Sequence, residues 1–131
     1  MHLYLDANVV VDVALKRVDE RGQPLWLAST LLLDEIHRAR NRGSTSVLSL
    51  YVVYVLVNPK DTRSGDLLAR EKLRNLRSFL TVADLTANIL EDSLKESRLA
   101  VEDAIQFVTA RSVGAEAIVT INIRHFSRVK N

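Results

Sequence analysis

The sequence predicts an α/β fold, a three-layer sandwich in which helices cover both faces of a central parallel sheet of four or five strands. Two observations lead to this prediction. Short apolar runs alternate along the chain with longer segments in which apolar residues recur every three or four positions. Strands joined by such helical segments are parallel, and the crossovers bury both faces of the sheet.

The first half of the chain contains two expected strands and two expected helices. Residues 2–5 form a short apolar strand, and helical spacing of apolar residues predicts a helix over residues 9–14. A second helix is expected over residues 25–39, because a proline precedes it and basic residues fill its last turn. Residues 45–50 resemble a strand, and the apolar run continues to Val55, so propensity alone favours strand throughout.

The second half contains three expected helices and two short strands. Residues 63–79 form an amphipathic helix that leads into a brief strand over residues 80–83. A threonine cap begins the next helix, over residues 86–94, and a further helix runs from about residue 101 to a glycine at 114. The last strand is expected over residues 117–120.

Length and charge indicate one folding unit without a strong overall field. The 131 residues are 47% hydrophobic, which suffices for one core, so we expect a single domain over residues 1–131. Eighteen Lys and Arg residues oppose sixteen Asp and Glu residues, and a net charge of +2 does not by itself indicate a nucleic-acid partner. A local basic surface, or a solvated basic tail, is expected near the C-terminus, from Arg111, Arg124, Arg128 and Lys130.

Several classes of site and location are disfavoured. The chain has no cysteine, which excludes disulfides, thiolate metal sites and cysteine nucleophiles. No glycine-rich phosphate loop supports a nucleotide cofactor. The N-terminus reaches Asp6 before a long apolar run develops, unlike a signal peptide, and the apolar run over residues 47–57 is shorter than the about 20 residues that span a bilayer. We therefore expect a soluble cytoplasmic protein.

Polar side chains follow the expected strands. Ligands of open parallel sheets collect beyond the carboxyl ends of the strands. The residues at those positions are Asp6, Asn8, Asp84, Thr120, Asn122 and His125. A helix that begins near Glu102 and Asp103 adds two carboxylates if its N-terminus points to the same edge. Converging carboxylates repel one another, and Mg²⁺ or Mn²⁺ relieves that repulsion and promotes phosphodiester hydrolysis.

Simpler roles exist for the same residues. Asp6 can cap a helix, and negative charge at Glu102 and Asp103 is favourable at any helix start. Asn8 and Asn122 suit turns. These alternatives explain the residue types one by one, but they do not explain why the polar residues follow successive strands.

Three segments together resemble the PIN-domain family, which includes the VapC-type toxin ribonucleases. They are LDANVVVD at residues 5–12, VEDAIQFVTA at 101–110 and IVTINIRHF at 118–126. Their order and spacing match the family over essentially the whole chain. The resemblance implies that residues 51–56 are helical. It also implies a cluster of usually four acids that holds Mg²⁺ or Mn²⁺ for endonucleolytic cleavage of RNA.

The resemblance carries over two of those four acids, Asp6 and Asp103. The second position falls at or near Val52, and the fourth is His125, so the chain departs from the family at both. Glu102 or Asp12 is expected to assist as a further metal ligand.

The remaining roles lie with neutral or titratable side chains at the last strand end. Asn122 is expected to position water or the ligands. His125 is expected to bind a metal, to move a proton or to contact a phosphate.

Two functions follow from these expectations. The first is a Mg²⁺- or Mn²⁺-dependent endoribonuclease, the toxin of a toxin–antitoxin pair. The second is a PIN-like domain that has lost catalysis and binds RNA or a protein, and the departures at Val52 and His125 favour it. The resemblance further implies a homodimer and, for a toxin, a small antitoxin protein that covers the acidic groove.

Overall fold

A four-stranded parallel sheet forms the centre of the molecule. The computed structural model describes residues 1–16, 26–38, 41–120, 126 and 129. The strand order is β3-β2-β1-β4, and each neighbouring pair is parallel. The strands are β1 (His2–Leu5), β2 (Arg42–Ser46), β3 (Thr81–Ala83) and β4 (Ala117–Val119). The last strand in the described part of the chain therefore pairs directly with the first.

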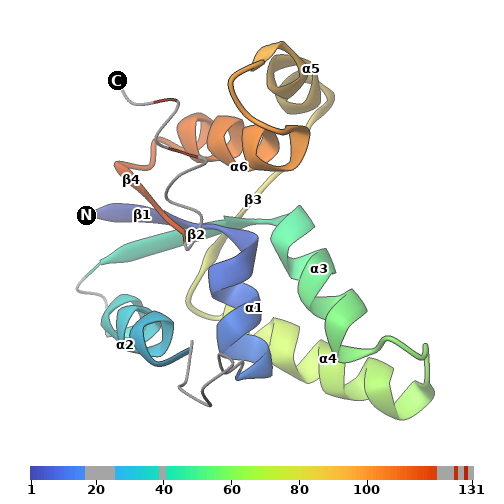
Figure 1. The fold of residues 1–131 in the computed structure, drawn as a ribbon. Helices are drawn as coiled ribbons and strands as arrows, with labels where there is room; N and C mark the ends of the chain where they lie inside the picture. Colours follow the sequence, from blue (N-terminus) through green and yellow to red (C-terminus); the bar gives the residue numbers. More distant parts are fainter. Residues whose placement is uncertain (17–25, 39–40, 121–125, 127–128, 130–131) are drawn as a thin grey trace, which may run out of the picture.

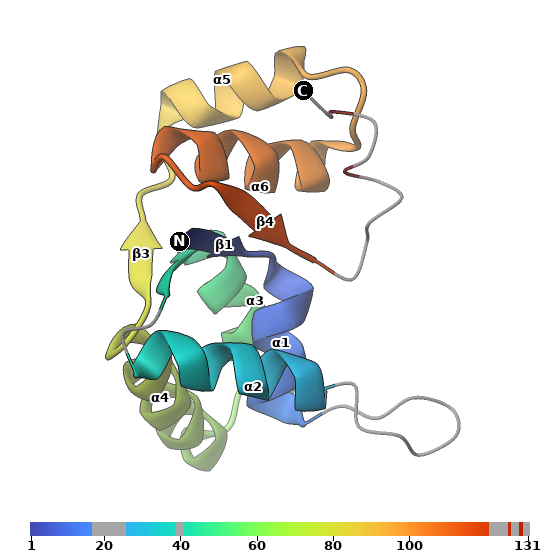
Figure 2. The ribbon, with the colours of Figure 1, turned by 90° about the vertical axis from the view of Figure 1, so that its left-hand side faces the viewer.

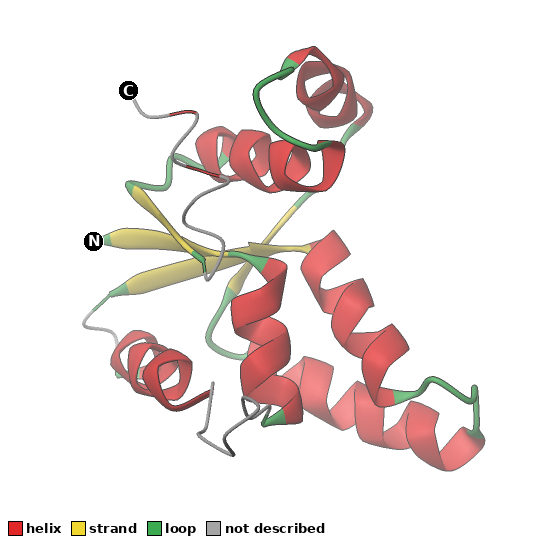
Figure 3. Cartoon of the chain, in the orientation of Figure 1, coloured by secondary structure: helices red, strands yellow, loops and turns green. Residues whose placement is uncertain are grey.

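Helices cover both faces of this sheet, which confirms the expected three-layer α/β/α fold (Figures 1 and 2). One layer consists of α5 (Ala87–Lys95) and α6 (Val101–Ser112). The other consists of α1 (Ala7–Leu15), α2 (Trp26–His37), α3 (Val47–Val57) and α4 (Arg63–Arg77). Figure 3 shows the strands between these two groups of helices. None of the described helices is both long and apolar enough to cross a membrane.

The larger core lies between the sheet and the layer of α1 to α4. Leu5, Val10 and Val53 are fully buried there, together with side chains from α2 and α4. Burying each side chain of this size contributes roughly 1.5–3 kcal/mol relative to exposure. Side chains alternate along a strand, so Tyr4, the neighbour of Leu5, points to the opposite face, toward α6.

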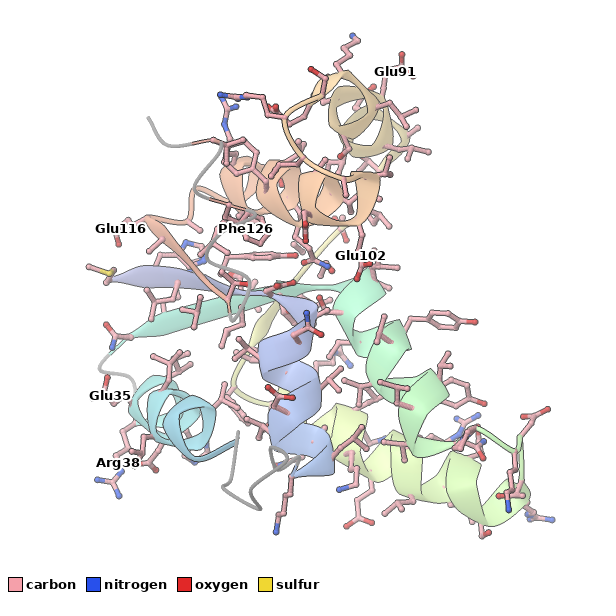
Figure 4. The ribbon with its side chains drawn as sticks, viewed as in Figure 1. Glu35, Arg38, Glu91, Glu102, Glu116 and Phe126 are labelled. Atoms are coloured by element: carbon pink, nitrogen blue, oxygen red, sulfur yellow. The ribbon has the colours of Figure 1, made fainter. Side chains whose placement is uncertain are left out.

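A second, smaller cluster lies against α6. It contains Leu99, Ala104 and Val129, with Phe107 and Phe126 packed against it. Figure 4 labels Phe126 below α6. The phenylalanine of the third sequence segment is therefore a packing residue.

The start of α3 corrects one prediction from propensity. Residues 45–50 were expected to be strand, but β2 ends at Ser46 and the helix begins at Val47. Ser46 caps the helix, because its hydroxyl oxygen accepts a hydrogen bond of 3.0 Å from the backbone N–H of Ser49. Burial of Val53 against the core outweighs the β-preference of this run. The helix that the resemblance implied for residues 51–56 is confirmed.

Most other element predictions are confirmed to within a few residues. The amphipathic helix ends at Arg77 rather than at residue 79, and the strand after it begins at Thr81. Thr86 caps α5, because its hydroxyl oxygen accepts a hydrogen bond of 3.2 Å from the backbone N–H of Ile89. After α6 the chain reaches Gly114 with a φ of 71°, the left-handed conformation that favours glycine.

Candidate active site

Asp6 stands at the junction of β1, β4 and α1. Its backbone N–H donates to the carbonyl oxygen of Val119 over 3.0 Å, which continues the β1–β4 pairing. Its side chain is 3% exposed and caps α1: Oδ1 accepts a hydrogen bond of 2.7 Å from the N–H of Ala7. Oδ2 accepts a hydrogen bond of 2.8 Å from the hydroxyl of Thr120, which follows β4. Asp6 therefore caps α1, and these hydrogen bonds hold its carboxylate at the carboxyl edge of the sheet.

The pKa of Asp6 is raised above its ordinary value. The largest cause is burial, which disfavours the charged form, and hydrogen bonds from Thr120 and Ala7 oppose it. The negative charges of Asp103 and Glu102 raise the pKa further. The bond between Tyr4 of β1 and Gln106 of α6 likewise holds α6, whose first turn carries these acids, against the strand that leads to Asp6. Elements almost a hundred positions apart in the sequence, β1 and α6, thus lie against each other.

The two acids on α6 lie in its first turn. Glu102 is exposed and Asp103 is half-buried. Figure 4 places Glu102 at the end of α6 that lies next to the beginning of α3. Two N-terminal helix ends and the end of β1 therefore meet in one region. Positive helix-dipole ends partly offset the repulsion among the carboxylates.

The described residues do not make up a complete metal centre. Among them, no three His, Asp or Glu side chains gather closely enough to hold a metal ion. Asp12 is 1% exposed and lies nearly two turns along α1 from Asp6, about 9 Å along the helix axis. Val52 is half-buried and packs against the larger core. The predicted residues Asn122 and His125 lie outside the described part of the chain.

Asn8 and Asp84 are two further polar candidates from the sequence that the structure describes. Asn8 is half-buried in the first turn of α1. Asp84 follows β3, which is the edge strand farthest from β4. It lines a cavity of about 720 Å³ between α5 and α6. Asp84 therefore belongs to a different part of the surface from Asp6.

Only Arg111 of the expected basic surface can be placed, because the other three cations lie outside the described residues. Arg111 is exposed, and its guanidinium carbon lies 5.7 Å from the centre of the Phe107 ring. This distance is within the range of a cation–π contact. The basic surface as a whole stays a prediction.

A buried polar layer beneath the acids was not anticipated from the sequence. The hydroxyl of Tyr4 donates to Oε1 of Gln106 over 2.5 Å, and the hydroxyl of Ser49 donates to the same oxygen over 3.4 Å. Burial raises the pKa of Tyr4 to about 12, so the phenol stays a hydrogen-bond donor at neutral pH. Two features of the sequence could have indicated this layer. Ser44, Thr45 and Ser46 are three successive polar residues in an inner strand, and Gln106 is a polar residue on a buried face of its helix.

Comparison with known proteins gives a clear result for the fold alone. No protein-family model and no curated protein matches the sequence. Solved structures of VapC-type proteins do match the structure. The structure of VapBC2 from Rickettsia felis, bound to a DNA fragment from its promoter, contains a chain with 20% identity and a TM-score of 0.67. The match covers 98% of this chain and 92% of that one.

A second match leads to the same fold. VapC20 from Mycobacterium tuberculosis, a toxin that cleaves the sarcin–ricin loop, has 15% identity and a TM-score of 0.67. The match covers 98% of this chain and 96% of that one. The chain has the PIN-domain fold of VapC-type proteins. Identities of 20% and 15% establish the fold without the activity, so the chemistry must be argued from the residues themselves.

In this PIN-domain fold, the chain retains buried and partly buried carboxylates where β1 ends and α6 begins. Hard carboxylate oxygens suit Mg²⁺ and Mn²⁺. A carboxylate whose pKa is raised by burial and by neighbouring acids gains from a cation that neutralises it. The residue types of Asp6, Asp103 and Glu102 therefore suit a divalent metal, but these three described acids do not by themselves gather closely enough to hold one.

Proposed function

We propose that this chain is a Mg²⁺- or Mn²⁺-dependent endoribonuclease that acts as the toxin of a toxin–antitoxin pair. One observation carries the proposal: the hydrogen bond from Tyr4 to Gln106 joins β1, which leads to Asp6, to α6, whose first turn holds Glu102 and Asp103. Mg²⁺ is commonly bound by one or two protein carboxylates together with waters and substrate phosphates. A site with fewer than four acids can therefore still bind a metal together with RNA.

Each residue of the proposed site has a defined part. Asp6 and Asp103 would hold the ion, and Glu102 would assist. A bound divalent ion lowers the pKa of water and offsets the negative charge that develops on a phosphodiester. Thr120 restrains one carboxylate oxygen of Asp6 by its hydrogen bond. The roles proposed for Asn122 and His125 rest on the family resemblance, and the role proposed for Asp12 rests on its place in the helix that follows Asp6.

A second function is favoured by Val52. An apolar, half-buried side chain supplies no ligand, and fewer anionic oxygens offset less of the dehydration of Mg²⁺. A PIN-like domain that has lost catalysis and binds RNA or a protein would keep the fold and the polar strand ends. The two functions differ in whether the acids bind metal.

Calorimetric titration of Mn²⁺ and then of Mg²⁺ tests the proposal. We expect binding to the wild type, with and without a non-cleavable RNA, and loss of binding in both Asp6→Asn and Asp103→Asn. Asp84→Asn is the matched control, because Asp84 is an exposed acid that follows another strand. Metal-dependent cleavage of a labelled RNA, stopped by a chelator, completes the test. Absence of metal binding even with RNA present would favour the non-catalytic function.

The proposal includes a small antitoxin protein as partner, in line with the VapC-type fold. An exposed apolar stripe on α3 supports it: Val47 is 50% exposed, Tyr51 61% and Val55 42%, at steps of four residues. The stripe begins next to the proposed site, so one bound segment could cover both. Tyr51→Asp is expected to weaken binding of the antitoxin without altering metal affinity. The proposed homodimer is tested separately by sedimentation equilibrium.

A further inference from the structure

Two structural elements carry both the candidate metal ligands and a buried hydrogen bond. Tyr4 lies on β1, and Asp6 follows two residues later, directly after that strand ends. Gln106 follows Asp103 by three residues on α6, so these two lie on one helix face. The bond from the Tyr4 hydroxyl to Oε1 of Gln106 therefore joins the elements that must hold Asp6 and Asp103 together.

The same oxygen also reaches a third element. Ser49, in the first turn of α3, directs its hydroxyl to Oε1 of Gln106 over 3.4 Å. The hydroxyl of Ser49 in turn lies 3.1 Å from that of Ser46, which caps α3. Gln106 is thus the point at which β1, α3 and α6 meet through polar contacts.

Gln106 is an unfavourable choice for stability alone. Its side chain is 1% exposed, and its Nε2 is buried without a hydrogen-bond acceptor among the described residues. A buried donor without an acceptor costs free energy, whereas an apolar side chain of similar volume would avoid that cost. Natural proteins tolerate such unfavourable groups mainly where function requires them.

We propose that Gln106 is a positioning residue whose hydrogen bond with Tyr4 fixes α6 against β1 and thereby holds Asp103 and Glu102 close to Asp6. The inference rests on the proposed metal-dependent function, because metal binding is what the positioning serves. Residues that orient metal ligands typically change metal affinity by about 10- to 100-fold when they are mutated.

The test compares metal affinity with stability in variants that remove the bond from either side. Tyr4→Phe deletes only the hydroxyl, and Gln106→Met replaces the amide by an apolar chain of similar size. Each is expected to weaken Mn²⁺ binding about ten-fold in calorimetry. The double variant should lose no more Mn²⁺ affinity than the single variant that binds more weakly. Both substitutions remove the same hydrogen bond, so their effects should not add. A residue with a merely structural role would lower the melting temperature and leave the affinity of the folded protein unchanged.

Ser93→Ala is the matched control. Ser93 is 1% exposed and donates a hydrogen bond of 2.6 Å to the carbonyl oxygen of Ile89, within α5 and away from the acids. Its loss should leave Mn²⁺ affinity within about two-fold of the wild type, a change too small for a residue that orients ligands.

The outcomes separate this inference from the proposed function. Wild-type affinity in both Tyr4→Phe and Gln106→Met would overturn the positioning role and leave the proposed function intact. A wild type that binds no Mn²⁺, with or without RNA, would overturn both. If Gln106→Met does not fold, Tyr4→Phe decides alone, because it removes one atom from a residue that keeps its ring.

Discussion

The hydroxyl of Thr120 donates a hydrogen bond of 2.8 Å to Oδ2 of Asp6 and so joins the last strand of the chain to the first. This bond lowers the pKa of Asp6, whereas burial and the acids on α6 raise it. Asp6 thus experiences opposing effects from β4 and α6. A proton and a metal ion compete for the same carboxylate, so this balance sets how strongly metal affinity depends on pH.

Thr120→Val should raise the pKa of Asp6 further, because the carboxylate loses a donor that favours its charged form. The measurement is a titration of the Asp6 carboxyl carbon by nuclear magnetic resonance. Mn²⁺ affinity should then fall more at acidic than at neutral pH. Thr81→Val, at an exposed position of β3, is the control and should leave the Asp6 titration unchanged. An unchanged titration in Thr120→Val would contradict the role assigned to this bond.

Asp6→Asn should be at least as stable as the wild type at neutral pH. Because the pKa of Asp6 is raised in the folded state, the folded chain binds the proton more tightly than the unfolded chain. The free energy of unfolding of the wild type therefore falls as pH rises from the ordinary aspartate value to the raised value, and levels off above it. An asparagine side chain does not titrate in this range, so the variant's relative stability should grow across that window.

Urea denaturation of the wild type and Asp6→Asn between acidic and neutral pH measures this difference. The asparagine amide oxygen can still accept a hydrogen bond from the N–H of Ala7, which preserves the cap of α1. If the variant is less stable by more than about 1 kcal/mol at neutral pH, capping outweighs the desolvation of the charge.

Val52→Glu should strengthen Mn²⁺ binding, because the family resemblance implies a carboxylate at or near this position. Position 52 lies one turn after Ser49, whose hydroxyl contacts Gln106 of α6. Without metal the variant should be less stable than the wild type, since it puts a charge at a half-buried position that packs against the larger core. Added Mn²⁺ should restore the melting temperature.

Val55→Glu provides the control for that substitution. Val55 lies on the same helix but is 42% exposed, so an acid there changes the charge of α3 without entering the core. Equal gains in Mn²⁺ affinity from both variants would show a nonspecific charge effect. A gain confined to Val52→Glu would place position 52 at the metal site.

Gly43→Ala should lower the free energy of unfolding by roughly 1–3 kcal/mol, the usual cost of overpacking a core. A Cβ at this position of β2 would lie 2.7 Å from Cδ1 of Ile36 and 2.8 Å from Cδ2 of Leu80. These contacts are too close, so the buried side chains of Ile36 and Leu80 would have to move aside within the core. Urea denaturation measures the change. Gly114→Ala is an informative contrast, because its Cβ meets no atom within 4 Å and only the φ of 71° disfavours it.

Local signals in the sequence determined most of the elements. The amphipathic spacing of α4, the threonine cap of α5 and the glycine after α6 each depend on residues a few positions apart. Such signals operate within one element, so they can be read without knowledge of the rest of the chain. Comparison of three separated segments with a known family supplied the helix after Ser46 and the expectation that Asp6 and Asp103 meet.

Tertiary structure decided the features that depend on contacts between distant segments. The run after Ser46 is helical because Val53 is buried in the core, although its β-branched residues favour strand. The Tyr4–Gln106 bond and the approach of Asp6 to the α6 acids exist because β1 is central and pairs with β4. Neighbours in the chain determine periodicity and caps, whereas the pairing of residues about a hundred positions apart depends on how the whole sheet assembles.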